Sequence, residues 1–342
     1  MSLHRPWLFL PSKLAHDLSP YGLEAYSLLM GSETTPVWNP YSFQNLFFKN
    51  RLGIAGGVDK NAEHLHAWMR VGCGFVEVGT VTPHPQEPNP GTIIHRHKES
   101  RALWNKMGFP SHGAEEVYYN LKKFKSSSSL PVFVNIGKNR TTENTEAQKD
   151  YMNLISHFSD VADAFVVNIS SPNTKGLRDL AERPNFTNFI APIKRHYEEL
   201  HLKAPLFLKM SPDLDEAGQE NVLLACLDQG FDGFILTNTT LDRQSTPFFP
   251  SEGGVSGKPL KEKSIQALIK AKNILEKQKH KKCLISVGGV MTAEDVFERI
   301  DLGADLVQVF STLIFEGPGF FRKVSKLAKI RQSTNTLNSS TR

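Results

Sequence analysis

The sequence predicts an α/β protein, a closed (β/α)8 TIM barrel that follows a small N-terminal helical appendage. Three observations support this prediction: eight short β-branched runs, helix-like stretches between most of them, and polar or glycine-rich residues directly after every run. Eight strands alternating with helices are typical of a closed barrel. The alternative is a doubly wound open sheet, which gives no reason for the number eight.

The composition is that of one large folded unit. The chain has 342 residues, of which 39% are hydrophobic, enough for a barrel-sized core with an appendage. The net charge is +5, but lysines and arginines are scattered among acids, so we expect no nucleic-acid partner. Cys73, Cys226 and Cys283 are far apart and lack metal-ligand spacing, which predicts buried, reduced cysteines of a cytosolic protein.

The N-terminal region is apolar but too short to cross a bilayer. No run approaches the roughly 20 apolar residues of a membrane span, and the start has no secretory signal. Residues 6–30 predict two short amphipathic helices broken near Ser19 and Pro20. Their apolar face can pack on the main domain or lie on a lipid surface, and periodicity alone favours packing. We expect an appendage and linker over 1–40, a barrel over 41–332, and a frayed, disordered tail over 333–342.

Predicted strands and helices alternate along the barrel region. The predicted strands are 52–56, 75–79, 132–136, 165–169, 206–210, 233–237, 284–287 and 306–310, and helix-like stretches include 62–71, 144–158, 188–200, 216–229, 262–278 and 293–302. Two longer connections interrupt this rhythm. Residues 83–110 predict a loop with short extra strands over one mouth of the barrel, and residues 241–259 predict a second cover.

The strand ends carry the candidate site, because active sites of such barrels form at the C-terminal ends of the strands. The residues there are Gly56, Gly57, Val58, Asp59, Lys60 and Asn61; Gly79 and Thr80; Asn135, Gly137, Lys138 and Asn139; Asn168 to Thr174; Lys209; Thr237 to Thr240; Gly288 and Gly289; and Phe310, Ser311 and Thr312. One polar turn can simply satisfy its own backbone. Eight such ends together predict a binding site.

The residue types narrow the class of ligand. Gly288, Gly289 and Ser311 follow the seventh and eighth strands, where backbone N–H groups commonly hold a phosphate, so a phosphate-bearing cofactor is expected. No GxGxxG follows a strand, which disfavours a nicotinamide fold of the Rossmann type. No cluster of histidines and carboxylates at the mouth recommends a metal, so none is expected.

Lysines and asparagines at the strand ends suggest the chemistry. Lys60 and Lys209 can stabilise an anionic reduced flavin ring or bind a substrate carboxylate, although a surface role is the ordinary one for a lysine. The amides of Asn105, Asn168, Asn173 and Asn238 offer donors and acceptors that suit a ring with alternating N–H and C=O groups, such as a pyrimidine.

Five ordered motifs resemble the quinone-dependent (class 2) dihydroorotate dehydrogenase family. They are Asn-Lys-Met-Gly-Phe at 105–109, Asn-Ile-Gly-Lys-Asn at 135–139, Asn-Ile-Ser-Ser-Pro-Asn-Thr at 168–174, Thr-Asn-Thr-Thr at 237–240 and Gly-Gly-Val-Ser-Gly-Lys-Pro-Leu at 253–260. The resemblance extends from about Leu8 to Ile330. It implies oxidation of (S)-dihydroorotate to orotate in de novo pyrimidine (UMP) biosynthesis, with electrons passing through FMN to a membrane quinone.

The resemblance also implies roles for individual residues. FMN contacts fall on Gly56, Gly57, Val58, Asp59, Lys60, Thr80, Asn135, Asn168, Lys209, Thr237, Gly257, Gly289, Phe310 and Ser311. Substrate contacts fall on Lys60, Asn105, Lys106, Met107, Gly108, Phe109, Asn168, Asn173, Asn238 and Thr239. Ser171 matches the base that removes the C5 proton while a hydride leaves C6 for the flavin. Thr174 and water would relay that proton. Lys175, Gly176 and the loop to Arg183 would cover the site, with Gly176 as hinge.

Two features of the resemblance imply the quinone class. Ser171 stands where the soluble relatives carry a cysteine, and the appendage is missing in those relatives. His16 and Arg96 match positions that line a quinone tunnel, and residues 7–10 would dip into the bilayer. By resemblance, therefore, the appendage both packs on the barrel and contacts lipid, and the protein is expected as a peripheral protein on the cytoplasmic face of the inner membrane.

Small departures and two alternatives accompany this interpretation. Gly56 replaces a frequent alanine, Asn61 and Ala62 replace a polar-glycine pair, and Phe310 replaces a common tyrosine, which affects details of flavin packing.

A flavin barrel like tRNA-dihydrouridine synthase should carry a catalytic cysteine in the mouth and a C-terminal RNA-binding domain. A non-enzymatic barrel that binds phosphate ligands would leave the strand-end lysines and asparagines unexplained.

Overall fold

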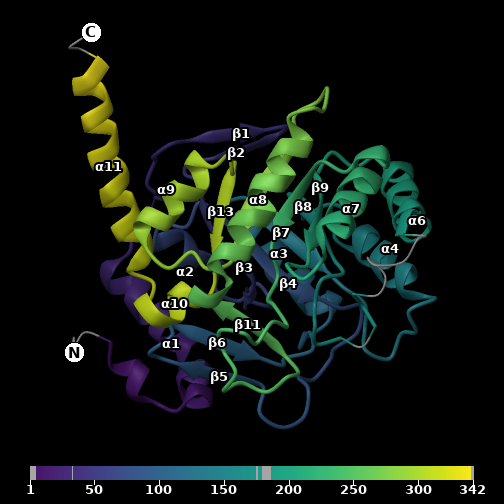
Figure 1. The fold of residues 1–342 in the computed structure, drawn as a ribbon, viewed down its shortest axis with the longest axis horizontal. Helices are drawn as coiled ribbons and strands as arrows, with labels where there is room; N and C mark the ends of the chain where they lie inside the picture. Colours follow the sequence, from purple (N-terminus) through teal and green to yellow (C-terminus); the bar gives the residue numbers. More distant parts are fainter. Residues whose placement is uncertain (1–4, 33, 175, 179–185, 340–342) are drawn as a thin grey trace.

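The computed structural model describes residues 5–32, 34–174, 176–178 and 186–339 (Figure 1). Eight parallel strands close into a barrel in the spatial order β10-β12-β13-β3-β4-β7-β8-β9, which confirms the predicted fold. The strands are β3 (Leu52–Asp59), β4 (Phe75–Val81), β7 (Val132–Ile136), β8 (Ala164–Asn168), β9 (Leu206–Met210), β10 (Gly233–Leu236), β12 (Cys283–Val287) and β13 (Leu306–Val309). Each overlaps one of the eight predicted runs.

Helices surround the barrel. They are α2 (Leu65–Arg70), α3 (Ala114–Lys125), α4 (Ala147–His157), α6 (Phe186–Glu199), α7 (Glu216–Asp228), α8 (Lys261–Leu275), α9 (Ala293–Asp301), α10 (Ser311–Glu316) and α11 (Phe320–Ser339). Side-chain caps fix two of the described helix starts: the Asp215 carboxylate accepts the Gly218 N–H at α7, and the Thr292 hydroxyl accepts the Asp295 N–H at α9. Helix α11 projects from the body and continues to Ser339, where the sequence predicted a frayed tail from Ser333 (Figure 1).

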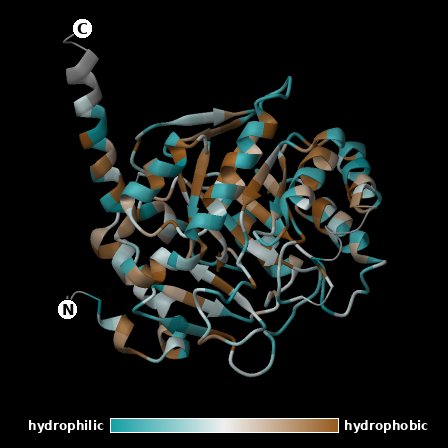
Figure 2. Cartoon of the chain, in the orientation of Figure 1, coloured by the Kyte–Doolittle hydropathy of each residue, from teal (hydrophilic) through white to brown (hydrophobic). Residues whose placement is uncertain are grey.

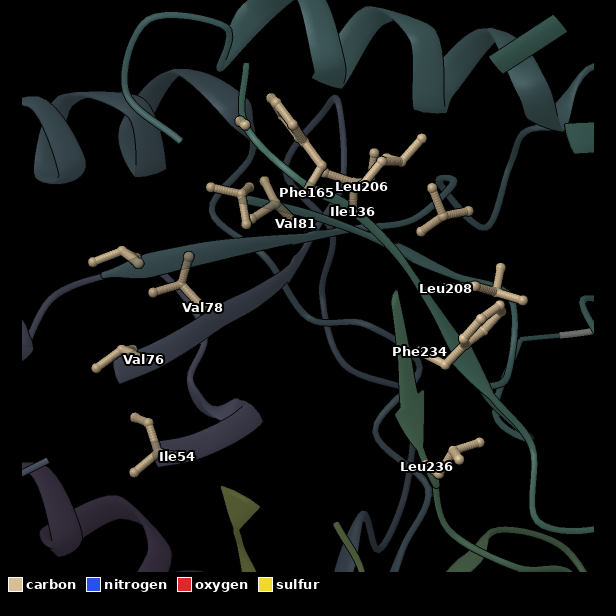
Figure 3. Close-up of a cluster of buried hydrophobic side chains, with 14 of the residues drawn as sticks. Ile54, Val76, Val78, Val81, Ile136, Phe165, Leu206, Leu208, Phe234 and Leu236 are labelled. Atoms are coloured by element: carbon tan, nitrogen blue, oxygen red, sulfur yellow. The ribbon is translucent and has the colours of Figure 1, made fainter. Parts of the chain in front are cut away.

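The hydrophobic core of the barrel has two parts, one outside and one inside the barrel wall. Outward-facing strand residues, including Val76, Val78, Phe165 and Leu206, pack toward the helices (Figure 3). The inward-facing residues toward the N-terminal end of the barrel form a second cluster, in which the Phe133 and Phe207 rings lie 5.3 Å apart. Figure 2 shows the resulting pattern, with hydrophobic strands at the centre and hydrophilic residues along the outer helices.

A hairpin that the sequence analysis missed closes the N-terminal end of the barrel. Strands β1 (Tyr41–Phe43) and β2 (Leu46–Phe48) alternate buried and exposed residues. Phe48 is 1% exposed, and its ring lies 5.6 Å from that of Phe75 and 6.1 Å from that of Phe133. Burial of such a ring stabilises a fold by roughly 1.5–3 kcal/mol, so the hairpin is part of the core.

The appendage consists of a 3-10 helix, η1 (Pro6–Phe9), and one long helix, α1 (Ser12–Met30). The predicted break near Pro20 is wrong, because α1 runs through it. Proline has no N–H to donate to the carbonyl of His16 one turn earlier, but the Ser19 hydroxyl donates to that carbonyl at 2.7 Å. This replacement satisfies the acceptor and lets the helix continue.

The two long connections join in one antiparallel sheet. Strands β5 (Ile94–His97) and β6 (Ala102–Asn105) confirm the extra strands predicted in the first connection. The second connection contributes β11 (Gly254–Gly257), which pairs with β6 and was not predicted, followed by the 3-10 turn η2 (Lys258–Leu260). Figure 1 shows this sheet at the opposite end of the barrel from the β1–β2 hairpin.

Candidate active site

One cavity occupies the C-terminal end of the barrel beside the β5–β6–β11 sheet. It encloses about 1040 Å³ of empty space, counting its open mouth. Predicted site residues that line it are Gly56, Gly57, Lys60, Thr80, Asn105, Met107, Gly108, Phe109, Asn168, Ser171, Asn173, Lys209, Thr237, Asn238, Thr239, Gly257, Gly289, Phe310 and Ser311. Residues more than 250 positions apart in the sequence therefore meet around one space, because parallel strands end at the same face of a barrel.

Four predicted residues of the barrel lie behind this lining or beside it. Val58, Asp59, Asn135 and Lys106 are absent from the cavity wall. The Asp59 carboxylate accepts the backbone N–H groups of Glu63 and His64 at 3.0 and 2.9 Å, and burial raises its pKa. Asp59 thus fixes the turn that carries Lys60 rather than facing a ligand.

Lys106 is oriented away from the site by an ion pair. Its ammonium lies 2.7 Å from a carboxylate oxygen of Glu252, on the second long connection. Its neighbours Asn105 and Met107 do line the cavity. Lys106 therefore links the two connections, and only its neighbours offer side chains to a ligand.

The floor of the cavity contains a buried carboxylate that the sequence analysis missed. Glu77 of β4 is 0% exposed, and its Oε1 accepts Lys209 Nζ at 2.8 Å and also the Asn135 amide. Its Oε2 accepts Gln308 Nε2 at 2.7 Å. These contacts hold the Lys209 ammonium in one place at the cavity wall and compensate its charge. A polar residue inside an apolar strand was the available signal: Glu77 in β4 and Gln308 in β13 both show it.

A chain of amides runs along the cavity wall. Asn168 Nδ2 donates to Thr80 Oγ1 at 2.9 Å and to Asn135 Oδ1 at 3.2 Å, and its Oδ1 accepts the Ser170 hydroxyl at 2.9 Å. Asn238 Nδ2 donates to the Ser170 hydroxyl at 2.9 Å. Because each amide is held by neighbours, its donor and acceptor atoms have fixed directions.

Several polar atoms of this wall retain unused hydrogen-bonding capacity. The buried atoms Asn173 Oδ1, Thr239 Oγ1 and Gln308 Oε1 have no hydrogen-bond partner among the described residues. The residues that carry them all line the cavity. Buried polar atoms are rarely left unpaired, so these three are suited to a polar ligand.

Ser171 lies in the same wall and is 4% exposed. Its Oγ accepts the backbone N–H of Asn173 at 3.2 Å, which fixes the hydroxyl in a tight turn. Nearby, Thr174 Oγ1 is buried and has no partner within the described part of the chain. Of the predicted cover, Lys175 and residues 179–183 lie outside the described residues, whereas Gly176 has a φ of +66°.

The end of the cavity near β12 and β13 has the features of a phosphate site. Gly289 has a φ of +68°, and a Cβ there would lie 2.3 Å from the Cα of Lys261, so only glycine fits. Buried Arg299, whose pKa burial lowers to about 10, donates to the Gly288 carbonyl at 3.0 Å. Ser311 begins α10, and its hydroxyl lies 2.7 Å from that of Ser256. These contacts hold backbone N–H groups and hydroxyls ready for an anion.

The two predicted quinone residues lie between the appendage and the barrel, outside the cavity lining. Arg96 donates to the carbonyls of Leu10 and Leu8 at 2.8 and 3.2 Å, so it ties η1 and the residue directly after it to the β5–β6 sheet. Burial, with a smaller effect of the nearby Lys60 charge, lowers the pKa of His16 to about 4. His16 is therefore a neutral imidazole at pH 7, on the Lys60 side of the site.

The fold and this pocket define a (β/α)8-barrel enzyme whose polar site lies at the C-terminal ends of the strands. The family model described as dihydroorotate dehydrogenase matches residues 40–330. The chain therefore belongs to the dihydroorotate dehydrogenase family, a family of flavin-dependent oxidoreductases.

Individual relatives are similar over most of the chain. A dihydroorotate dehydrogenase (quinone) from Bartonella tribocorum is 42% identical over 82% of this chain and 78% of its own length. One from Chelativorans sp. is 39% identical over 98% and 93%. The crystal structure of DHODH from Eimeria tenella in complex with ferulenol has a TM-score of 0.85 and 32% identity, covering 96% of this chain and 93% of that one. The chain is thus a quinone-dependent member of the family, as the motifs predicted.

Proposed function

We propose that the chain oxidises (S)-dihydroorotate to orotate with bound FMN and passes the electrons to a membrane quinone, as a step of pyrimidine biosynthesis. One observation supports this proposal above the others. A single cavity brings together the hydroxyl of Ser171, the ammonium groups of Lys60 and Lys209, and the asparagine amides. A proton acceptor, cations and directional amides are the groups that oxidation of a carboxylated pyrimidine ring needs.

The pocket fits FMN in the chemistry of its donors. Gly257, Gly289 and Ser311 would hold the phosphate at the β12 and β13 end, and Lys209 and Thr237 would contact the ring system. When bound, FMN would supply the acceptor for the hydride that leaves C6 of the substrate. Glu77 keeps the Lys209 ammonium at a fixed position, where its positive charge stabilises negative charge on a neighbouring ring.

The substrate would be held by amides and one cation. Asn173 Nδ2 donates to Asn105 Oδ1 at 2.9 Å, so these side chains form one wall, and Asn238 and Thr239 form another. The free acceptors Asn173 Oδ1 and Thr239 Oγ1 suit ring N–H groups. Lys60 suits the substrate carboxylate, because it is a cation that lines the same cavity as these amides.

Ser171 would remove the proton from C5. A free serine is a weak base, so the reaction needs exclusion of bulk water and onward transfer of the proton. Ser171 is nearly buried, and the unpartnered hydroxyl of Thr174 three residues later provides a group for that transfer through water.

The appendage would contact a membrane from one side. No helix in the described part of the chain is long and apolar enough to cross a bilayer. Helix α1 and η1 nevertheless expose large apolar side chains, among them Phe9 at 65%, Tyr21 at 75% and Leu29 at 81%. Such a surface favours shallow burial in lipid, so we place the protein peripherally on the cytoplasmic face of the inner membrane, with His16 and Arg96 beside the quinone.

An anaerobic titration tests the proposal. The purified yellow protein should bleach on addition of dihydroorotate, and its flavin absorbance should return with a quinone but not with fumarate or NAD. Retention of full absorbance with excess dihydroorotate would contradict the activity. Recovery with fumarate instead would leave the first half-reaction intact and contradict the quinone.

A further inference from the structure

An arginine with little exposure lies next to the loop that carries Ser171. Arg178 is 11% exposed, and its three guanidinium nitrogens donate in three directions. Its Nε donates to the Ser170 carbonyl at 2.8 Å, its Nη2 donates to the Thr239 carbonyl at 2.6 Å, and its Nη1 donates to Asp213 at 2.7 Å. One side chain thus joins the loop after β8 to the loop after β10.

Asp213, in the loop after β9, is the counter-charge that fixes this arginine. Its Oδ2 also accepts the Leu241 N–H at 2.8 Å, and its Oδ1 accepts the Thr240 hydroxyl and Lys263 Nζ, the latter at 3.3 Å. Burial alone would raise the pKa of Asp213, but the bonds from Thr240, Leu241 and Arg178 outweigh burial and lower it. The carboxylate therefore stays charged at neutral pH and holds Arg178 in one orientation.

The contacts of Ser170 connect this network to the chemistry. Its carbonyl accepts from Arg178, and its hydroxyl accepts from Asn238, so the residue is held on both sides. Ser171 follows directly. A displacement of about 1 Å of a reacting group can slow a reaction about a hundredfold, so the support of this loop bears on the rate.

We propose that Arg178, fixed by Asp213, is a positioning residue that sets the Ser171 hydroxyl against the substrate held by Asn238 and Thr239. This inference rests on the proposed role of Ser171 as base. Arg178 itself does not line the cavity and contacts no reacting atom. Its planar group matches three separate acceptors at once, which a lysine ammonium at the end of a flexible chain does not do.

The test is a double-mutant cycle on the holoenzyme. Flavin reduction by dihydroorotate is followed by anaerobic stopped flow in wild type, Arg178→Met, Ser171→Ala and the double variant. We expect Arg178→Met to slow reduction at least about tenfold when Ser171 is present, and by less than about threefold in the Ser171→Ala background. Oxidation of the dithionite-reduced variant by quinone should stay within about twofold of wild type, because Ser171 takes no part in that half-reaction.

Two further variants keep the test decisive. Arg178→Lys retains the charge beside Asp213 and should fold even if Arg178→Met does not; we expect it to reduce at least about threefold more slowly than wild type. Lys125→Met is the matched control, because Lys125 pairs with Asp163 at similar burial before the start of β8. It should leave both half-reactions unchanged.

Each outcome bears on a different claim. Equal losses with and without Ser171, or normal reduction in Arg178→Met or Arg178→Lys, would overturn the positioning role and leave the base intact. Near-normal reduction in Ser171→Ala would overturn the base, and the positioning role with it. A third outcome would show that Arg178 serves only general stability. In that case Arg178→Met would lose both flavin reduction and oxidation by quinone, while Arg178→Lys would reduce at the wild-type rate.

Discussion

Replacement of Glu77 by glutamine should destabilise the holoenzyme by about 3–5 kcal/mol. The substitution keeps the shape of the side chain and removes its charge, leaving Lys209, which is 5% exposed, without its counter-charge. The neutral amide also supplies one acceptor oxygen where the carboxylate supplied two, to Lys209 and Asn135 on one side and Gln308 on the other. In the variant, the Gln308 Nε2 donor faces either an acceptor oxygen or a second amide nitrogen. Rotation of the Gln308 amide can restore a donor–acceptor pair there, but it cannot neutralise the Lys209 charge.

Urea unfolding in a fixed excess of FMN measures this cost, and a second background isolates its cause. In Lys209→Met the uncompensated charge is gone, so Glu77→Gln should cost at least about 2 kcal/mol less there than in wild type. Fixed FMN keeps the ligand contribution comparable within each background. Equal costs in both backgrounds, to within about 0.5 kcal/mol, would refute the reasoning that Glu77 acts by compensating Lys209.

Three other predictions concern the base, the appendage and a titrating group. Ser171→Ala should stay yellow and bind orotate but reduce at least about a hundredfold more slowly in stopped flow; near-normal reduction at neutral pH would exclude the base role. Deletion of residues 1–30 should slow turnover with a long-chain quinone and leave flavin reduction by dihydroorotate unaltered, and unchanged quinone turnover would contradict the membrane role. The pKa of His16 is lowered to about 4, so the unfolded chain binds more protons between pH 6.5 and 4, and stability falls as the pH drops through that window. His16→Gln should flatten this dependence in urea titrations, and an unaltered slope would place the effect elsewhere.

The barrel strands could be predicted because they are buried on both faces and therefore read as short apolar runs. The hairpin β1–β2 was missed for the opposite reason. Its strands have three residues each, too short to stand out beside the longer runs. The exposed position of β2 is also apolar, since it is Phe47, so no alternation of polar and apolar residues marks that strand. The long helix α1 was divided in the prediction because proline normally ends a helix, and the hydroxyl of Ser19 that compensates for Pro20 acts through a local contact.

The cavity lining could be predicted from residues that follow the strands, since barrel geometry brings those positions together. The residues that hold the lining side chains in position could not be predicted in the same way. Glu77 and Gln308 lie inside strands, and Asp213 and Arg178 lie in loops whose contacts depend on the folded arrangement. Conversely, Asp59 and Lys106 stand beside lining residues but turn toward backbone N–H groups and toward Glu252. Neighbourhood in sequence does not determine the direction of a side chain.

The pairing of β6 with both β5 and β11 has a consequence for exchanging parts between relatives. Residues 102–105 pair with 94–97 on one side and with 254–257 on the other, so two connections about 150 positions apart share one set of backbone hydrogen bonds. A chimera that imports only one of these connections from a relative would bring a strand edge shaped for a different neighbour. We expect chimeras to fold when both connections come from the same parent. The two connections therefore have to be exchanged together, although they are far apart in the sequence.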